Sequence, residues 1–220
     1  MSEPLIRFDR VCFAYGHGRP VLADCDLALR AGDRIGLVGD NGSGKTTLLS
    51  LIVGLLRPTG GRIEAFGRAR ACEADFVEVR RRAGLLFQDA DDQLFCPTVA
   101  EDVAFGPLNL GLSRHEARGI VRRTLDALGL AAYENRITYR LSGGEKRLVA
   151  LATVLAMEPD VLLLDEPGTG LDEASTERVI EILNGLPQAM LVVSHDRQFL
   201  ARTTTSTLRL VEGRLETIAD

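Results

Sequence analysis

Residues 34–46 read RIGLVGDNGSGKT, a short apolar strand that runs straight into a glycine-rich loop. The loop matches the pattern GxxxxGK[ST], and an apolar stretch predicted as a helix, Thr46–Leu56, follows it. Such a loop turns several backbone N–H groups toward one anion, and the helix N-terminus adds partial positive charge. We predict that Lys45 neutralises β- and γ-phosphate oxygens and that Thr46 places its hydroxyl on Mg²⁺. The residues expected to contact the nucleotide here are Gly39, Asp40, Asn41, Gly42, Ser43, Gly44, Lys45, Thr46 and Thr47.

A second strand carries the acidic half of such a site. Val161–Leu164 is wholly apolar and is followed directly by Asp165 and Glu166. Ligands of α/β sheets bind at the C-terminal ends of the strands. We expect Asp165 to hold Mg²⁺ through water and Glu166 to polarise the attacking water as general base. An acidic turn before Pro167 explains these carboxylates equally well when they are taken alone, and only the loop at Gly39 favours catalysis.

Strand and helix patterns alternate along the chain, and the strands are nearly continuous apolar runs. This predicts an α/β fold with a mainly parallel sheet covered on both faces. Val21–Leu29 alternates, which places Ala23, Cys25, Leu27 and Leu29 on one face and Asp24 and Asp26 on the other. From Asp89 to about Arg140 helix patterns are broken by Pro97, Pro107, Gly111 and Gly129. Further predicted strands are Arg62–Phe66, Ala83–Phe87, Met190–Ser194, Thr207–Val211 and Arg214–Ile218, and further helices are Gly143–Met157 and Ser175–Leu183.

Composition excludes several classes of protein. A chain of 220 residues with 45% hydrophobic residues suits one α/β domain, and a net charge of −5 argues against nucleic acid as partner. The four cysteines form no CxxC pair, which argues against a disulfide scaffold and favours a reducing cytosol. The start, MSEPLIRFDR, lacks the pattern of a signal peptide, and apolar runs fall short of a membrane span. Arg80–Arg82 is expected to be a solvated face.

The stretch Leu141-Ser-Gly-Gly-Glu145 predicts a capping box, with Ser142 capping a helix whose third residue is Glu145. Alone it would indicate only a well-capped helix. It stands about a hundred residues after the loop and about twenty before Asp165. With these neighbours the chain resembles the ATP-binding subunits of ABC transporters over essentially its full length.

That resemblance implies a P-loop NTPase core, an N-terminal antiparallel β subdomain and an inserted helical subdomain at about 89–145, all within a single ABC ATP-binding domain, 1–220. It also implies that Ser142, Gly143, Gly144 and Glu145 face ATP held by an opposite subunit, so that two ATPase copies or paralogues sandwich two nucleotides.

Four further positions fit the same resemblance. Gln88 matches the glutamine that touches Mg²⁺ and senses the γ-phosphate, and His195 matches the switch histidine that contacts that phosphate. Tyr15 matches the aromatic residue that stacks on adenine, with a buried strand tyrosine as the alternative. Asp172, in Gly170-Leu-Asp172, matches the loop that runs along the dimer interface. The chain departs from the family in reading Pro167-Gly168 where Pro-Thr is usual.

The stretch Phe87–Leu112 resembles the ATPases of energy-coupling factor (ECF) transporters, especially the cobalt and nickel type. Its acidic residues surround apolar ones, which suits docking of a basic amphipathic helix, although a plain helical insertion with solvated acids is the alternative. The resemblance implies a transmembrane coupling protein and a substrate-capturing membrane protein as partners, at the cytoplasmic face of the membrane. Substrates across the family are Co²⁺, Ni²⁺, biotin and other vitamins. The acids are Asp89, Asp91, Asp92, Glu101 and Asp102, and the apolar residues are Leu94, Phe95, Val103 and Phe105.

Three rival functions stay open at this point. A non-transport ABC ATPase usually has two cassettes or a long coiled coil, and neither fits 220 residues. A P-loop kinase or GTPase would leave the Ser142 motif without a purpose, and no NKxD motif is present. A regulator that binds ATP without turnover is disfavoured because Glu166 and His195 are both present. Many ECF ATPases carry a further C-terminal extension that helps to hold the nucleotide-free dimer together, whereas this chain stops soon after the predicted strand Arg214–Ile218. We therefore expect dimerisation of this chain to depend strongly on ATP.

Overall fold

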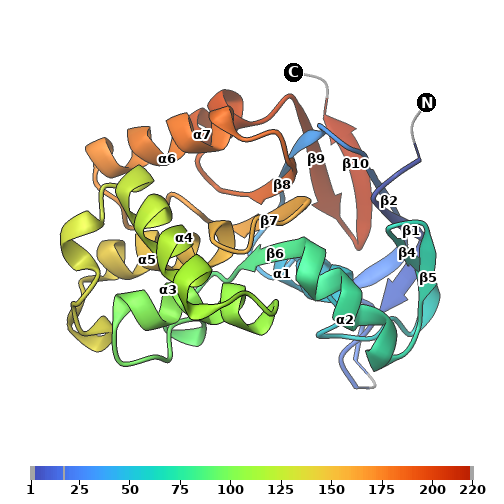
Figure 1. Cartoon of the computed structure of the whole chain (residues 1–220). Coiled ribbons are helices and arrows are strands. Elements are labelled where there is room, and N and C mark those ends of the chain that lie inside the picture. The colour runs from blue at the N-terminus through green and yellow to red at the C-terminus, as the bar shows by residue number, and fades with distance from the viewer. Residues whose placement is uncertain (1–2, 17, 219–220) are drawn as a thin grey trace. The chain divides into compact units, whose positions relative to one another are not determined.

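The computed structural model describes residues 3–16 and 18–218, which form two compact units. The first unit combines the chain up to Leu85 with Asp160–Asp165 and the chain from Pro187 onward. The second unit combines Leu86–Pro159 with Glu166–Leu186. Figure 1 shows both units and labels most of their elements.

The first unit contains two sheets. A four-stranded antiparallel sheet has the order β2-β1-β4-β5, and a six-stranded sheet has the order β10-β9-β3-β8-β7-β6. In the second sheet β3 pairs in parallel with β8 and β9, and β7 pairs in parallel with β8, as predicted. In the same sheet β9 and β10 form an antiparallel hairpin. The strands are β1 Ile6–Phe13, β2 Leu22–Leu29, β3 Arg34–Val38, β4 Gly60–Ala65, β5 Arg68–Arg70, β6 Ala83–Leu86, β7 Val161–Asp165, β8 Ala189–Val193, β9 Ser206–Val211 and β10 Arg214–Ile218.

The core of the first unit joins both sheets to the helix that follows the glycine-rich loop. Every residue of β7 and β8 is buried, which is why these strands read as unbroken apolar runs. Leu37, Leu163 and Leu191 belong to the same buried cluster as Phe8 of the antiparallel sheet. The helix is α1, Lys45–Ile52, whose buried face includes Leu48, Leu49 and Leu51.

A bulge interrupts the antiparallel pairing of β1 with β2. The register shifts between Phe8 and Phe13, and Arg10 and Asp24 have positive φ angles of 46° and 49°. Because the bulge adds a residue, Leu22 and Cys25 are both buried while Ala23 is half-buried. The predicted placement of Ala23 on the face of Cys25 is therefore wrong.

The outer edge of β2 is covered by the β9–β10 turn. The N–H of Ala23 donates to the carbonyl of Gly213 at 2.9 Å. Gly213 has φ 79°, and a Cβ there would lie 2.7 Å from the nitrogen of Ala23. Glycine is therefore required for this close approach.

Helix α1 ends four residues earlier than predicted. Gly54 has φ 73°, and the N–H of Leu55 turns back to the carbonyl of Ser50 at 2.9 Å. A Cβ at Gly54 would lie 2.1 Å from the Phe76 ring, so the helix stops where another helix packs against it. That helix is α2, Glu73–Arg82, which the sequence patterns did not predict.

The end of α2 corrects the expectation of a solvated arginine face. Arg82 pairs with Asp160 at 2.6 Å, and its guanidinium lies 3.8 Å from the centre of the Phe66 ring. Arg80 donates to the carbonyl of Val53 at 3.2 Å. Only Arg81 of the three is exposed.

The second unit is helical and is built around α3, which packs on α4 and α5. Helix α3 continues through the buried Pro107, contrary to the predicted break, and ends two residues later at Asn109. Gly111 and Gly129, with φ 93° and 69°, follow the ends of α3 and α4 as predicted. The helices are α3 Val99–Asn109, α4 Arg114–Ala127, α5 Gly143–Leu155 and α6 Glu173–Gly185, and the first unit adds α7, Arg197–Thr203.

No helix within residues 3–16 and 18–218 has the length and apolar character needed to cross a bilayer.

Candidate nucleotide site and signature helix

The glycine-rich loop encloses the side chain of Lys45. Its ammonium donates to the carbonyls of Gly39 at 2.8 Å and Asp40 at 2.9 Å, and the residue is only 8% exposed. Gly39 and Gly44 have φ 157° and 107°. A Cβ would meet the carbonyl oxygen of Leu210 at 2.8 Å from the first position and Val21 at 2.6 Å from the second. The loop therefore needs its glycines both for conformation and for close packing.

Thr46 and Asp165, both predicted to serve Mg²⁺, lie together. The hydroxyl of Thr46 donates to Oδ2 of Asp165 at 2.6 Å, and Asp165 is 2% exposed at the end of β7. A buried carboxylate beside a hydroxyl is an oxygen donor set that suits a hard divalent cation.

Tyr15 lies beside helix α1. Its hydroxyl is 3.0 Å from Oγ1 of Thr47, and its ring packs edge-on against Phe13 with 4.8 Å between centroids. The side chain is 57% exposed, which excludes the alternative of a buried strand tyrosine. An exposed ring tethered at its hydroxyl is suited to stacking on a planar base.

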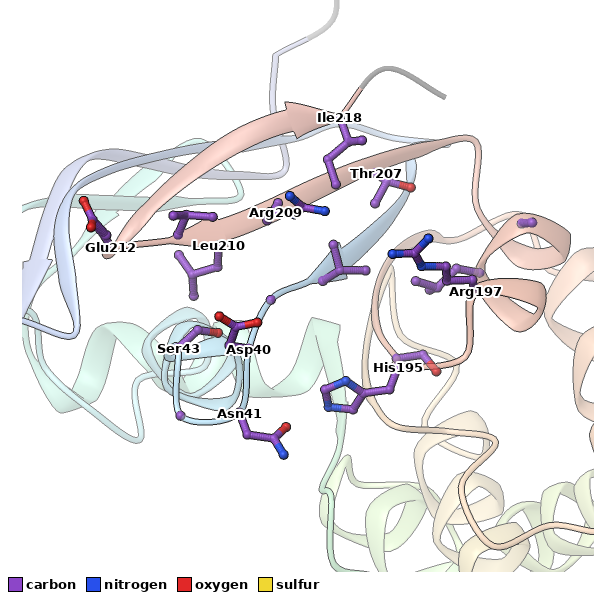
Figure 2. A pocket seen from close by; sticks show the side chains of 17 residues that line it. Asp40, Asn41, Ser43, His195, Arg197, Thr207, Arg209, Leu210, Glu212 and Ile218 are labelled. Atoms are coloured by element: carbon purple, nitrogen blue, oxygen red, sulfur yellow. The ribbon is translucent and has the colours of Figure 1, made fainter.

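A pocket of about 1070 Å³ opens beside the loop (Figure 2). Residues 39–43 line one side, and the β9–β10 hairpin lines another. His195, which directly follows the buried Ser194, is exposed and also lines the pocket. Figure 2 shows Arg197 and Arg209 at the same pocket, on opposite walls. The sequence analysis missed both arginines, because a lone arginine in a strand or helix carries no distinguishing signal.

In the second unit Glu166 has an uncommon backbone. Its φ is 55°, a conformation that costs a non-glycine residue on the order of 1–3 kcal/mol. The residue is 7% exposed, and the hydroxyl of Thr169 donates to its Oε2 at 3.1 Å. The N–H of Thr169 also donates to the carbonyl of Glu166 at 3.2 Å. The turn after β7 therefore holds this carboxylate in one orientation.

The predicted capping box at Ser142 is confirmed. The N–H of Glu145 donates to Oγ of Ser142 at 3.3 Å, and the N–H of Ser142 donates to Oε2 of Glu145 at 2.7 Å. Glu145 also accepts from the hydroxyl of Tyr133 at 2.8 Å and pairs with Arg136 at 3.2 Å. The N–H of Ser142, followed by the Tyr133 hydroxyl, lowers the pKa of Glu145. Its carboxylate thus shapes the start of α5 from within the chain.

The stretch Leu141–Glu145, called the signature below, contains two glycines that differ in their surroundings. A Cβ on Gly143 would meet nothing within 4 Å, whereas one on Gly144 would lie 2.9 Å from the carbonyl oxygen of Gly170. The signature therefore adjoins the Gly170–Asp172 segment. There Asp172 caps α6 by accepting from the N–H of Ser175 at 2.7 Å, which lowers its pKa.

Gln88 has an exposed side chain, and its backbone is attached to α5. The guanidinium of Arg147 donates to the carbonyls of Phe87, at 2.6 Å, and of Gln88. The side chain of Gln93 adds a second attachment, since its amide donates to Ala150 at 3.1 Å. Neither Arg147 nor Gln93 was predicted as a site residue.

Two residues of the expected docking surface are internal. Asp102 is 2% exposed and Val103 is fully buried, so they cannot belong to the surface to which the sequence analysis assigned them. Phe95 and Phe105 are 65% and 47% exposed and pack edge-on with 4.7 Å between centroids. Asp89, Asp92 and Glu101 are exposed beside them in the sequence.

The model of the ABC transporter family matches residues 22–169, more than half of the chain. The chain belongs to the ABC transporter family. It is 53% identical over 213 residues to a protein of Nitratidesulfovibrio vulgaris that has only the general name of ABC transporter ATP-binding protein, covering 96% of this chain and 78% of that one.

Other relatives have more specific names. A cobalt import ATP-binding protein, CbiO, of Rhodobacter capsulatus is 44% identical, with 96% of this chain and 77% of CbiO covered. An energy-coupling factor transporter ATP-binding protein, EcfA, of Methanothermobacter thermautotrophicus is 38% identical, with 96% and 69% covered.

A solved structure of the ATP-binding cassette MJ0796, a dimer bound to ADP and Pi in a post-hydrolysis state, matches this chain. Its own TM-score is 0.88 at 26% identity, with 96% of each chain covered. The chain is therefore an ATP-binding ABC subunit and an ABC ATPase.

Proposed function

We propose that this ABC ATPase energises an ECF-type importer, of cobalt or nickel ions in the first instance. The observation that carries the proposal is the exposed Phe95–Phe105 pair in a segment rich in acids. Aromatic side chains that stay exposed on the folded chain are typical anchors of protein interfaces, and acidic residues near them favour a basic partner helix. The likeness to CbiO and EcfA supports both the transporter type and the ion.

The site residues divide between binding and hydrolysis in this proposal. Tyr15 stacks on adenine, and the loop of residues 39–47 holds the phosphates, with Lys45 moving from its carbonyl partners to the anion. Ser142–Glu145 of a second copy or paralogue closes over the same nucleotide, with Asp172 along that interface. Glu166 is the general base, and His195 contacts the γ-phosphate.

Thr46, Asp165 and Gln88 are the residues that would hold Mg²⁺ in this scheme. The hydroxyl–carboxylate pair of Thr46 and Asp165 fits such an ion. Bound there, Mg²⁺ supplies positive charge that neutralises phosphate oxygens.

Hydrolysis is tested by Glu166→Gln. We expect ATP turnover to fall by about 10²–10⁴-fold, as is typical when a general base is removed. Thr169→Ser, which keeps the hydroxyl beside Glu166, is the control and should keep most of the activity. Normal turnover by Glu166→Gln would refute the assignment of the base.

The transporter role is tested by affinity purification of the chain from its native membranes in mild detergent. Recovery of a transmembrane coupling protein with a substrate-capture protein supports the proposal. Phe95→Asp with Phe105→Asp should lose these partners while ATP binding stays unchanged. Val77→Asp, which places one carboxylate on α2 where an apolar side chain is 45% exposed, should retain them. Recovery of soluble partners alone would favour a non-transport ABC ATPase.

The substrate is tested in a strain that lacks this chain. Loss of Co²⁺ or Ni²⁺ uptake with unchanged biotin uptake is the expected result. The reverse pattern would assign the chain to a vitamin importer of the same type.

A further inference from the structure

Asp102 joins the loop that carries Phe95 to the segment that leads into the signature. Its Oδ1 accepts from the N–H of Phe95 at 3.0 Å and of Cys96 at 2.9 Å. Its Oδ2 accepts from the hydroxyl of Thr138 at 3.0 Å. Asp102 and Thr138 are 2% and 4% exposed, so these contacts form away from water. A buried carboxylate with three donors is held firmly, because losing one donor leaves charge uncompensated.

Backbone contacts bring the same two segments together. The N–H of Thr138 donates to the carbonyl of Pro97 at 3.1 Å, and Thr98 forms an isolated β-bridge with Ile137. The Thr138 hydroxyl is the side-chain contact that adds to these, and it reaches Asp102 across 36 positions in the sequence.

Thr138 lies four positions before the signature serine. It begins a short 3-10 helix, Thr138–Arg140, and the N–H of Leu141 donates to its carbonyl at 3.2 Å. Ser142 follows as the cap of α5. A displacement of Thr138 is thus passed to Ser142 through one turn of hydrogen-bonded backbone.

We propose that Asp102 and Thr138 are positioning residues that couple occupation of the Phe95–Phe105 pair to the placement of Ser142. This inference rests on the proposed function, since it assumes that Ser142 meets nucleotide and that Phe95 meets a partner. Because coupling is reciprocal, ATP bound at the signature must alter the loop around Phe95. That effect can be measured on the isolated chain, paired with its own copy, without its membrane partners.

The experiment measures hydrogen–deuterium exchange in Glu166→Gln protein, which retains ATP, with and without Mg–ATP. We expect ATP to slow exchange in peptides covering 39–47 and, by at least about fivefold, in those covering 94–98. Adding Thr138→Val removes the hydroxyl while keeping the side-chain shape. It should abolish the slowing of exchange by ATP at 94–98 but leave the slowing at 39–47 unchanged. Thr138→Ser should restore it.

The matched control is Thr203→Val. Thr203 is another buried threonine, 1% exposed, and its hydroxyl donates to the carbonyl of Phe199 at 2.8 Å in α7. It should lose similar stability in urea yet keep the ATP response at 94–98. If Thr138 had only a structural role, Thr138→Val would speed exchange at 94–98 equally with and without ATP. The ratio of the exchange rates without and with ATP would then stay the same as in the parent protein.

Three outcomes overturn the inference. An unchanged ATP response at 94–98 in Thr138→Val shows that the hydroxyl does not couple the sites. Absence of that response in the parent protein, while 39–47 is protected, shows that no coupling exists. Absence of protection at 39–47 in the parent is different, because it refutes the proposed ATP site itself and the inference with it.

Discussion

Gly143→Ala separates a signature that serves folding from one that serves a second subunit. A methyl group at this position meets nothing within 4 Å in the chain. Alanine is also the better helix former, by up to about 1 kcal/mol. If Gly143 had only a local role, the substitution would leave the protein equally stable or slightly more so, with full activity.

The proposed trans contact predicts a different result. The added methyl group projects from the open start of α5 toward nucleotide held by the opposite copy, and it blocks approach to the backbone N–H groups. Misplaced or blocked donors at a developing charge commonly cost about 10²-fold or more in turnover. We expect ATP hydrolysis to fall by at least about tenfold while stability is kept.

The assay pairs urea denaturation with steady-state ATP hydrolysis. Gly119→Ala is the control, since Gly119 lies inside α4 and its Cβ would make an ordinary 3.6 Å contact with Arg123. It should gain similar stability without loss of activity. Gly143→Ala protein that hydrolyses ATP at the normal rate would refute the reasoning that Gly143 faces a nucleotide.

Three further predictions concern other parts of the chain. Lys45→Ala should weaken ATP binding measured by calorimetry at least about tenfold, because its charge is lost from the phosphate loop. Lys146→Ala, which removes a lysine of α5 that pairs with Asp91, should not weaken it, and equal ATP affinities of the Lys45→Ala protein and the parent would contradict the loop assignment. The N–H of Cys72 lowers the pKa of Asp75 to about 2, so Asp75 contributes stability above about pH 4 that disappears as the pH falls toward 2. Urea unfolding should accordingly show Asp75→Ala destabilised at pH 6, with a difference from the parent that shrinks as the pH falls through about 2, and a difference independent of pH would disprove the link. Burial raises the pKa of Cys25 to about 12, so iodoacetamide at pH 8 should label exposed Cys72 and spare Cys25, as mass spectrometry can check.

Strands and the phosphate loop could be predicted because their signals are local. The loop needs glycine at set positions, and a strand buried on both faces must be apolar throughout, so Val161–Leu164 could hardly be anything else. The capping box at Ser142 was equally readable, since both partners lie within four residues.

What could not be predicted depends on contacts between distant segments. The bulge at Asp24 moves Ala23 to the other face of β2, and no residue type in β2 predicts that bulge. Asp102 looked like one more surface acid until the fold placed Thr138 and two N–H groups around it. Gly54, by contrast, is a residue type that commonly ends helices, but the apolar residues Leu55 and Leu56 after it favoured a longer predicted helix.

The turn that covers β2 bears on the tendency of this protein to aggregate. An unpaired strand edge is a template for another chain, and bulges and covering turns are common protections. Here the bulge at Asp24 and the Gly213 turn protect neighbouring stretches of one edge. The β9–β10 turn, which contributes no predicted catalytic group, therefore guards the antiparallel sheet against edge-to-edge association. Substituting Gly213 would open that edge, and the first symptom would be aggregation rather than slower ATP hydrolysis.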